Sequence, residues 1–128
     1  MDNQFDFKKA ERISLHREIG RLFEQGKVFI SHPLRVVYLE QKPFSGATVS
    51  ILISVPKKKI KLAVERNRMK RLIREAYRLN KTNLIKSLQE KDSGLLIAFL
   101  FIGNEVCQWD TLEESMQKAI KILMEKTE

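Results

Sequence analysis

The sequence predicts an α+β fold in which helices cover a small β-sheet, with elements in the order α-β-β-α-β-α. Apolar residues recur at helical spacing in three segments, and runs rich in β-branched and aromatic residues lie between them. The chain has 128 residues, 43% of them hydrophobic, which is enough for one compact core. No repeat or linker divides it, so residues 1–128 are expected to form a single domain.

A first helix is predicted over residues 15–24. Ser14 can serve as its N-cap and Gly26 marks its end, and the apolar residues at helical spacing between them are Leu15, Ile19, Leu22 and Phe23. Residues 1–13 lack a sustained apolar period. We expect them to form an extended N-terminal arm.

Two strands are expected next, over residues 34–39 and 49–55. The first is rich in β-branched and aromatic residues, and the second alternates serine and leucine with isoleucine and valine, so one of its faces can join the core. Turn-forming residues around Pro43 and Gly46 separate the strands, which predicts a hairpin. Pro56 ends the second strand because proline cannot donate to the ladder.

A basic helix follows these strands. The segment from Pro56 to Lys81 holds eleven Lys and Arg against two Glu, so it accounts for all of the net charge of +8. At 100° per residue one side of the helix is apolar: Met69, Leu72, Ile73, Ala76, Tyr77 and Leu79. Another side carries Asn67, Lys70, Arg71, Arg74 and Arg78, named here the cation row. An Arg71–Glu75 ion pair at i,i+4 would offset little of this field.

The last two elements are a strand and a helix. A turn at residues 91–94 precedes a continuous apolar run, residues 95–101, typical of a strand buried on both faces. A final helix begins at Trp109 or Asp110, with Asp110 as a candidate cap and Glu113 three residues later. Its apolar side is expected to contain Leu112, Met116, Ala119, Ile120 and Leu123.

Nothing in the chain forms a recognisable catalytic constellation. His16 and His32 have no nucleophile or metal-ligand spacing around them, and no phosphate-binding loop occurs. The lone Cys107 favours a reducing compartment and is most simply a small apolar filler. No signal peptide is evident, and the longest apolar run is far shorter than the ~20 residues that span a bilayer. We therefore expect a cytoplasmic protein that has no membrane partner and acts by binding a ligand.

Nucleic acid is the expected ligand. Arginine binds phosphate bidentately, and Asn67 adds an amide that can read a base edge or a 2′-hydroxyl. Phe23, Tyr38 and the serine face of the second strand could form a groove for unpaired bases, which favours RNA, although both aromatics are equally well explained as core. A ribosomal or assembly protein would use the same cations. A DNA-binding helix is less favoured, because no dimerisation element or helix-turn-helix pairing is evident.

The segment ISVPKKKIKLAVERNRMKRLIREAYR resembles the Arg-Asn-Arg signature of the bacterial ribonuclease P protein subunit. Two further segments, AERISLHREIGRLFEQGKVF and PLRVVYLE, resemble that family's first helix and first strand. The resemblance covers roughly residues 8–100 in order. It implies a left-handed βαβ crossover around the basic helix, against the right-handed default.

The resemblance also implies a mechanism. In that family the holoenzyme removes the 5′ leader from precursor tRNA by Mg²⁺-dependent hydrolysis, and the RNA subunit holds the catalytic centre. The protein would then have no catalytic residue, no stably bound cofactor and no obligate protein partner. The implied RNA-subunit contacts are Lys57, Lys58, Arg66, Asn67, Arg68, Lys70, Arg71, Arg74 and Arg78. The implied leader cleft, between the first helix and the sheet, consists of Ile19, Phe23, Val36, Tyr38 and Ser54.

Overall fold

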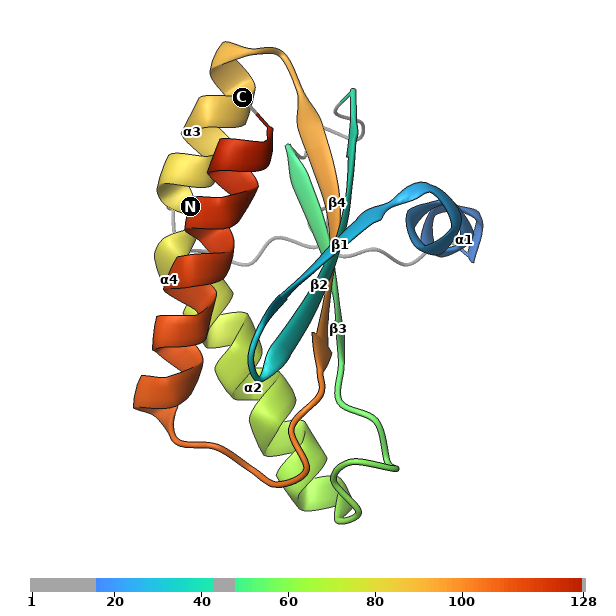
Figure 1. The fold of residues 1–128 in the computed structure, drawn as a ribbon, viewed down its shortest axis with the longest axis vertical. Helices are drawn as coiled ribbons and strands as arrows, with labels where there is room; N and C mark the ends of the chain where they lie inside the picture. The colour runs from blue at the N-terminus through green and yellow to red at the C-terminus, as the bar shows by residue number, and fades with distance from the viewer. Residues whose placement is uncertain (1–15, 43–47, 128) are drawn as a thin grey trace, which may run out of the picture.

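A four-stranded mixed sheet lies at the centre of the structure (Figure 1). The computed structural model describes residues 16–42 and 48–127. The strands are β1 (Lys27–Ser31), β2 (Leu34–Gln41), β3 (Val49–Ser54) and β4 (Gly94–Phe101), in the order β1-β2-β4-β3. β2 pairs antiparallel with β1 and β4, and β3 pairs parallel with β4.

β4 has a neighbour on each side and helices over both faces, as its continuous apolar sequence predicts. Every residue from Gly94 to Phe99 is buried, and so is Phe101. A strand with no polar side cannot lie at the surface, so the most apolar strand occupies an inner position of the sheet. The prediction of a strand buried on both faces is confirmed.

The two faces of the sheet are covered unequally. α2 (Ala63–Asn80), α3 (Thr82–Glu90) and α4 (Trp109–Lys126) pack on one face, and the shorter α1 (His16–Gln25) packs on the other (Figure 1). α1 matches its predicted range within one residue. It ends at Gln25. At the next residue, Gly26, a Cβ would collide with the carbonyl oxygen of Leu22, so a glycine lets the chain turn directly into β1.

The three-helix face holds the larger core. Met69, Ile73, Ala76 and Tyr77 of α2 are buried there, and the Tyr77 and Phe99 rings lie 5.8 Å apart. The predicted apolar side of this helix is thus largely confirmed. Leu79 is the exception, since its side chain is 43% exposed at the margin of the apolar arc.

The predicted hairpin between residues 34–39 and 49–55 is wrong. β4 lies between β2 and β3, and the antiparallel partner of β2 along the chain is β1, which the sequence analysis did not predict. β1 and β2 are joined through His32 and Pro33, whose peptide bond is cis. Pairing β4 with both strands buries its apolar side chains more completely than an outer position would.

Two helical details also differ from prediction. Only Lys81 separates α2 from α3, a helix that was not predicted. Leu84 and Leu88, spaced i,i+4, are buried and attach α3 to the core. The N-cap of α4 is Gln108 without a side-chain hydrogen bond, so Asp110 is in the first turn, where its charge still favours the helix dipole. The N-terminal arm over residues 1–13, the Ser14 cap and the turn at Pro43 and Gly46 lie outside the described residues.

The sheet centre should dominate stability. We expect Phe99→Ala to lower the free energy of unfolding by about 3–5 kcal/mol, because a fully buried ring leaves a cavity between the sheet and α2. Val106→Ala, at a loop residue that is 37% exposed, should change it by less than about 0.5 kcal/mol. Urea unfolding followed by circular dichroism measures both. Similar values for the two variants would contradict this assignment of the core.

Candidate nucleic-acid interface

α2 presents cations on the side opposite its buried residues. Asn67, Arg68 and Arg71 are exposed, while Lys70, Arg74 and Arg78 are partly exposed. Lys57 and Lys58 are exposed in the turn before the helix. Because Met69, Ile73 and Tyr77 anchor the other side of α2 in the core, the positive charges of this helix are held on an element that is fixed in the fold.

Arg66 has a second role that the sequence analysis missed. Its Nη1 donates hydrogen bonds to the carbonyl oxygens of Ile60 at 3.0 Å and Lys61 at 2.8 Å. These bonds tie the turn that carries Lys57 and Lys58 to the first turn of α2. The guanidinium is therefore partly committed within the protein, although it was predicted only as an RNA contact. The sequence gives no signal for these two bonds, because their acceptors are backbone carbonyl groups, which every residue has.

The turn itself is ordered by the backbone. The amides of Lys59 and Ile60 both donate to the carbonyl oxygen of Pro56, at 3.0 and 3.1 Å, and the Ile60 side chain is buried. Lys59 Nζ also donates to Asn104 Oδ1 at 3.3 Å, which links the turn to the loop after β4. Lys57 and Lys58 thus project from a fixed loop beside α2.

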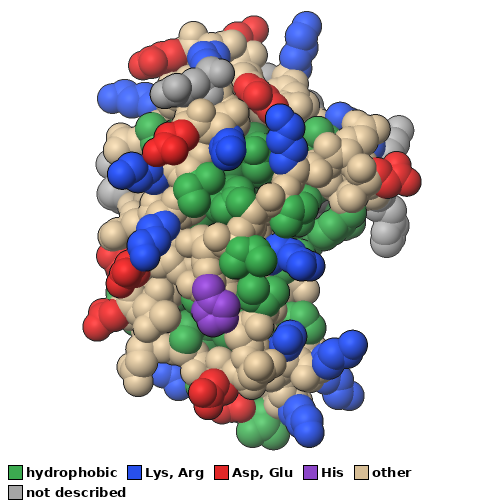
Figure 2. Space-filling view, viewed as in Figure 1, with side chains coloured by type: hydrophobic (Ala, Val, Ile, Leu, Met, Phe, Trp, Pro, Cys, Tyr) green, Lys and Arg blue, Asp and Glu red, His purple; other side chains and the backbone are tan. Residues whose placement is uncertain are grey.

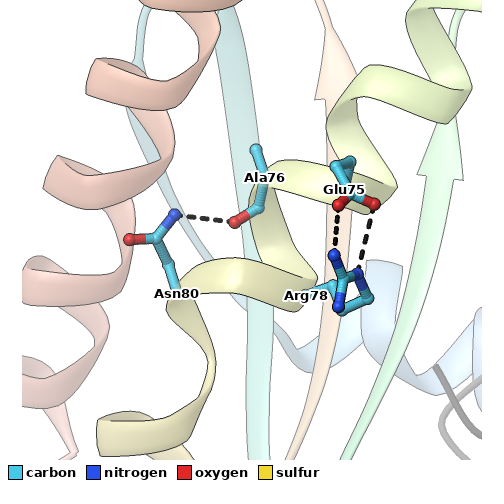
Figure 3. Close-up of polar contacts among 4 residues, drawn as sticks. All are labelled: Glu75, Ala76, Arg78 and Asn80. Atoms are coloured by element: carbon cyan, nitrogen blue, oxygen red, sulfur yellow. Dashed lines mark hydrogen bonds and ion pairs between the residues drawn. The ribbon is translucent and has the colours of Figure 1, made fainter. Parts of the chain in front are cut away.

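Glu75 pairs with Arg78, not with Arg71 as predicted. Arg78 donates through Nε to Glu75 Oε2 at 3.1 Å and through Nη2 to the other carboxylate oxygen, in a bidentate arrangement (Figure 3). This hydrogen-bonded guanidinium lowers the pKa of the Glu75 carboxyl. Nearby, Asn80 Nδ2 donates to the Ala76 carbonyl oxygen at 2.7 Å (Figure 3). The positive charge of Arg78 is therefore partly balanced, whereas that of Arg71 is not offset by Glu75.

The candidate cleft lies on the α1 face of the sheet. Ile19 is half-buried against this face, and Phe23, one helical turn further on, is 47% exposed. Leu22, Val37, Leu96 and Ala98 form the small core beneath α1. Ser54 is half-buried at the end of β3 and belongs to the same face of the sheet, because its pairing partner Leu100 packs against that core. The structure therefore brings Ile19, Phe23 and Ser54 to one side of the sheet.

Val36 and Tyr38 do not belong to this cleft. Both are buried in the core on the three-helix face, where the Tyr38 ring meets the Phe29 ring edge-on at 5.9 Å. Burial, and to a lesser extent the charge of Glu40, raises the pKa of Tyr38. Successive residues of a strand face opposite sides, so the assignment was one residue out of register. Arg35 is the one charged residue in the run LRVVYL, and its charge indicates which side of the strand is less buried. Val37 and Leu39 share that side with Arg35, and it is the side that faces α1.

Figure 2 shows this region as a hollow in the molecular surface, beneath α1 at the right of the view. Hydrophobic side chains gather above it, and Lys and Arg side chains lie at its margin and below it.

Within the described residues, no helix is long and apolar enough to cross a membrane. The same part of the chain contains no group of three or more His, Cys, Asp or Glu residues placed to hold a metal ion.

The Arg66 hydrogen bonds can be tested by amide exchange. We expect Arg66→Ala to speed exchange of the Lys59 and Ile60 amides at least tenfold, because a bond from a charged donor contributes about 1.5–3 kcal/mol. Arg66→Lys, which keeps the charge but not the planar fork, should recover little of the protection. Arg68→Ala, at the exposed neighbouring arginine, is the matched control. Unchanged exchange in Arg66→Ala would show that the turn is held by its backbone alone.

Known proteins resemble this chain over most of its length. A family model described as Ribonuclease P matches residues 7–124. The ribonuclease P protein component of Porphyromonas gingivalis is 46% identical over 116 residues, covering 91% of this chain and 85% of the relative. That of Clostridioides difficile is 31% identical over 123 residues, 96% of each chain.

Solved structures show the same fold. The RNase P protein of Staphylococcus aureus superposes with a TM-score of 0.68 at 23% identity, over 89% of this chain and 95% of that one. The RNase P protein from Thermotoga maritima gives a TM-score of 0.67 at 23% identity, over 88% and 96%. The matched family model, the curated relatives and the shared fold together establish that the chain belongs to the ribonuclease P protein family.

Proposed function

We propose that this chain binds the catalytic RNA of ribonuclease P through α2 and the adjacent Lys57–Lys58 turn, and receives the 5′ leader of precursor tRNA in the cleft between α1 and the sheet. The observation that carries the proposal is the two-sided character of α2. One side is fixed in the core and the other displays cations on a rigid helix. The family assignment makes a catalytic RNA the partner that fits this surface.

The cation row of α2 and the adjacent Lys57–Lys58 turn are suited to binding an RNA backbone. A rigid row of guanidinium groups can meet phosphate oxygens in bidentate geometry without ordering a flexible tail. Each neutralised phosphate releases counterions, so affinity should fall steeply with salt. Arg68, Arg71, Lys57 and Lys58 are the most exposed cations of the set. Exposed Asn67 stands among them, where its amide can contact a base edge or a 2′-hydroxyl.

The proposal assigns the chemistry to the RNA. The protein would bind and orient, and the holoenzyme would remove the leader by hydrolysis that requires Mg²⁺, as the family resemblance implies. In this scheme the RNA holds the metal ions and the protein raises the affinity for leader-bearing substrate. The complex would act in the cytoplasm.

The cleft suits a single strand. Phe23 offers an exposed ring on which a base can stack, and Ile19 continues this apolar wall toward the sheet. Ser54 supplies a hydroxyl on the opposite wall, near the turn that carries Lys57 and Lys58. The leader would thus lie close to the surface proposed for the catalytic RNA.

Reconstitution tests the proposed function directly. The protein, combined with its cognate catalytic RNA at low Mg²⁺ concentration, should stimulate cleavage of precursor tRNA at the 5′ end of the mature sequence. The RNA alone serves as the control. Absence of stimulation in a complex that still forms would leave a non-catalytic RNA-binding role and would contradict the proposal.

The salt dependence should locate the RNA-subunit contacts. We expect Arg71→Ala combined with Arg74→Ala to weaken binding of the catalytic RNA and to flatten the slope of log K against log salt by about 1–2, one phosphate contact per arginine. The fold should persist, because neither side chain is in the buried arc. Lys86→Ala combined with Lys121→Ala removes the same charge from exposed positions on α3 and α4. An equal slope change in that control would indicate general charge attraction only.

Phe23 should distinguish leader-bearing from leaderless substrate. Phe23→Ala is expected to weaken binding of precursor tRNA by about 1–3 kcal/mol, the range for one base stacked on an aromatic ring, and to leave mature tRNA unaffected. Val106→Ala, another exposed apolar residue but distant in sequence from the cleft elements, is the control. Equal losses for both RNAs would remove Phe23 from the leader site.

A further inference from the structure

β1 is an outer strand whose free edge is uncovered. Within residues 16–42 and 48–127, no strand pairs with that edge, and Lys27, Val28 and Ile30 are exposed along it. β3, the outer strand at the other end of the sheet, has no exposed residue. Charged side chains usually protect such an edge from pairing with another chain, but the three central residues of β1 are uncharged. The edge of β1 is therefore suited to pairing with a further strand.

A groove of about 390 Å³ follows this edge, between β1 and α4. Ile30 and Ser31 line it on the strand side, and Glu114 and Lys118 line it on the helix side. Consecutive residues of a strand face opposite sides of a sheet, so a groove that reaches both Ile30 and Ser31 wraps around the edge of β1. The Ser31 hydroxyl donates to the carbonyl oxygen of Ser115 at 2.8 Å, which fixes α4 beside the end of the strand.

The sequence of β1 is complementary to itself. Two antiparallel copies, related by a two-fold axis at Phe29, place Val28 of one copy opposite Ile30 of the other, and Lys27 opposite Ser31. Val28 and Ile30 are 57% and 55% exposed, and they face the same side because they are two residues apart. In this register each uncovered aliphatic side chain therefore packs against one from the second copy.

The charges are complementary on the opposite side of the strand. Lys27 and Ser31 are four residues apart and share a side, which is that of α4, because Ser31 is bonded to Ser115. The second copy's Lys27, directly opposite Ser31, thus points toward the wall of the groove that carries Glu114. Glu114 is exposed and pairs with Lys118 at 3.2 Å, and a carboxylate has a second oxygen for another cation. The two-fold axis makes this contact twice.

We propose that two copies of the free protein associate through the outer edges of β1, with Val28 opposite the second copy's Ile30 and Lys27 beside the second copy's Glu114. The interface uses neither the cation row nor the leader cleft, so it does not depend on the proposed function. A five-residue strand with its adjoining groove is a small contact area, and the association should be weak and reversible. The net charge of +8 opposes it, which makes about 0.15 M salt, where charges more than about 8 Å apart are screened, the condition for its measurement.

Disulfide cross-linking tests the register. Val28→Cys and Ile30→Cys are prepared as two separate proteins, each with Cys107→Ser so that it holds one cysteine. Directly opposite residues have Cα atoms about 4.5–5.5 Å apart, which suits a disulfide, whereas diagonal neighbours are about 7–8 Å apart, beyond its reach. With oxidised glutathione as the oxidant, an equimolar mixture should form linked dimers at least about tenfold faster than either protein alone, because only the mixture places two cysteines opposite each other. Non-reducing electrophoresis measures the rates.

Charge reversal tests the contact between Lys27 and Glu114. In sedimentation velocity over a concentration series, Glu114→Lys should weaken dimer formation at least about tenfold, because it faces the second copy's Lys27 with a like charge. Adding Lys27→Glu to this variant should restore the dimer, since the attraction returns with its sign exchanged. Glu90→Lys, at an exposed residue of α3 outside the groove, makes the same change in net charge and is the matched control. Thermal unfolding verifies that each variant is folded.

The outcomes are distinct. Faster cross-linking in the mixture, together with a dimer that Lys27→Glu restores, supports the proposal. A monomer at every concentration, with no advantage for the mixture, would overturn it. Equal cross-linking in either protein alone would contradict the register, and an equal loss in Glu114→Lys and Glu90→Lys would show that net charge, and not the proposed contact, controls association.

Discussion

The parallel pairing of β3 with β4 is the constraint on which the rest of the structure depends. Parallel neighbours cannot be joined by a tight turn, so the chain must leave the end of β3, cross one face of the sheet and return to the start of β4. α2 and α3 form that crossover. The same connection fixes the Lys57–Lys58 turn at the end of β3 and sets the cationic side of α2 outward, because its apolar side must cover β4.

Unequal coverage of the two faces then determines where a cleft can form. Three helices cover one face, while α1, with only 10 residues, covers part of the other. Its buried contacts are concentrated on Leu22, which closes a core of four residues with β2 and β4. The rows of the sheet beyond that core remain accessible. The cleft is thus a consequence of a helix too short to cover the sheet, and needs no special local conformation.

The sequence predicted well what local patterns determine and poorly what the pairing of distant segments determines. The apolar arc of α2 and the continuous apolar run of β4 are strong periodic signals, and both were confirmed. The hairpin failed because adjacency in sequence outweighed the requirement of β4 for two neighbours. Val36 and Tyr38 failed because three apolar residues in succession, Val36 to Tyr38, hide the register of β2, which Arg35 alone could have fixed. The Arg66 bonds depend on backbone carbonyls and leave no mark in side-chain identity.

The positive charge of residues 56–81 also shows the difference between what a sequence pattern predicts and what tertiary contacts determine. A count of cations treats every lysine and arginine between Pro56 and Lys81 as equivalent, but the structure does not. Arg66 donates to two carbonyl oxygens and Arg78 holds Glu75, so part of the positive field organises the protein before any RNA is bound. Arg68 and Arg71 instead point into solvent from the same helix. Internal bonds that orient the turn and the helix make the exposed cations more effective, since a preorganised phosphate site loses less conformational freedom on binding.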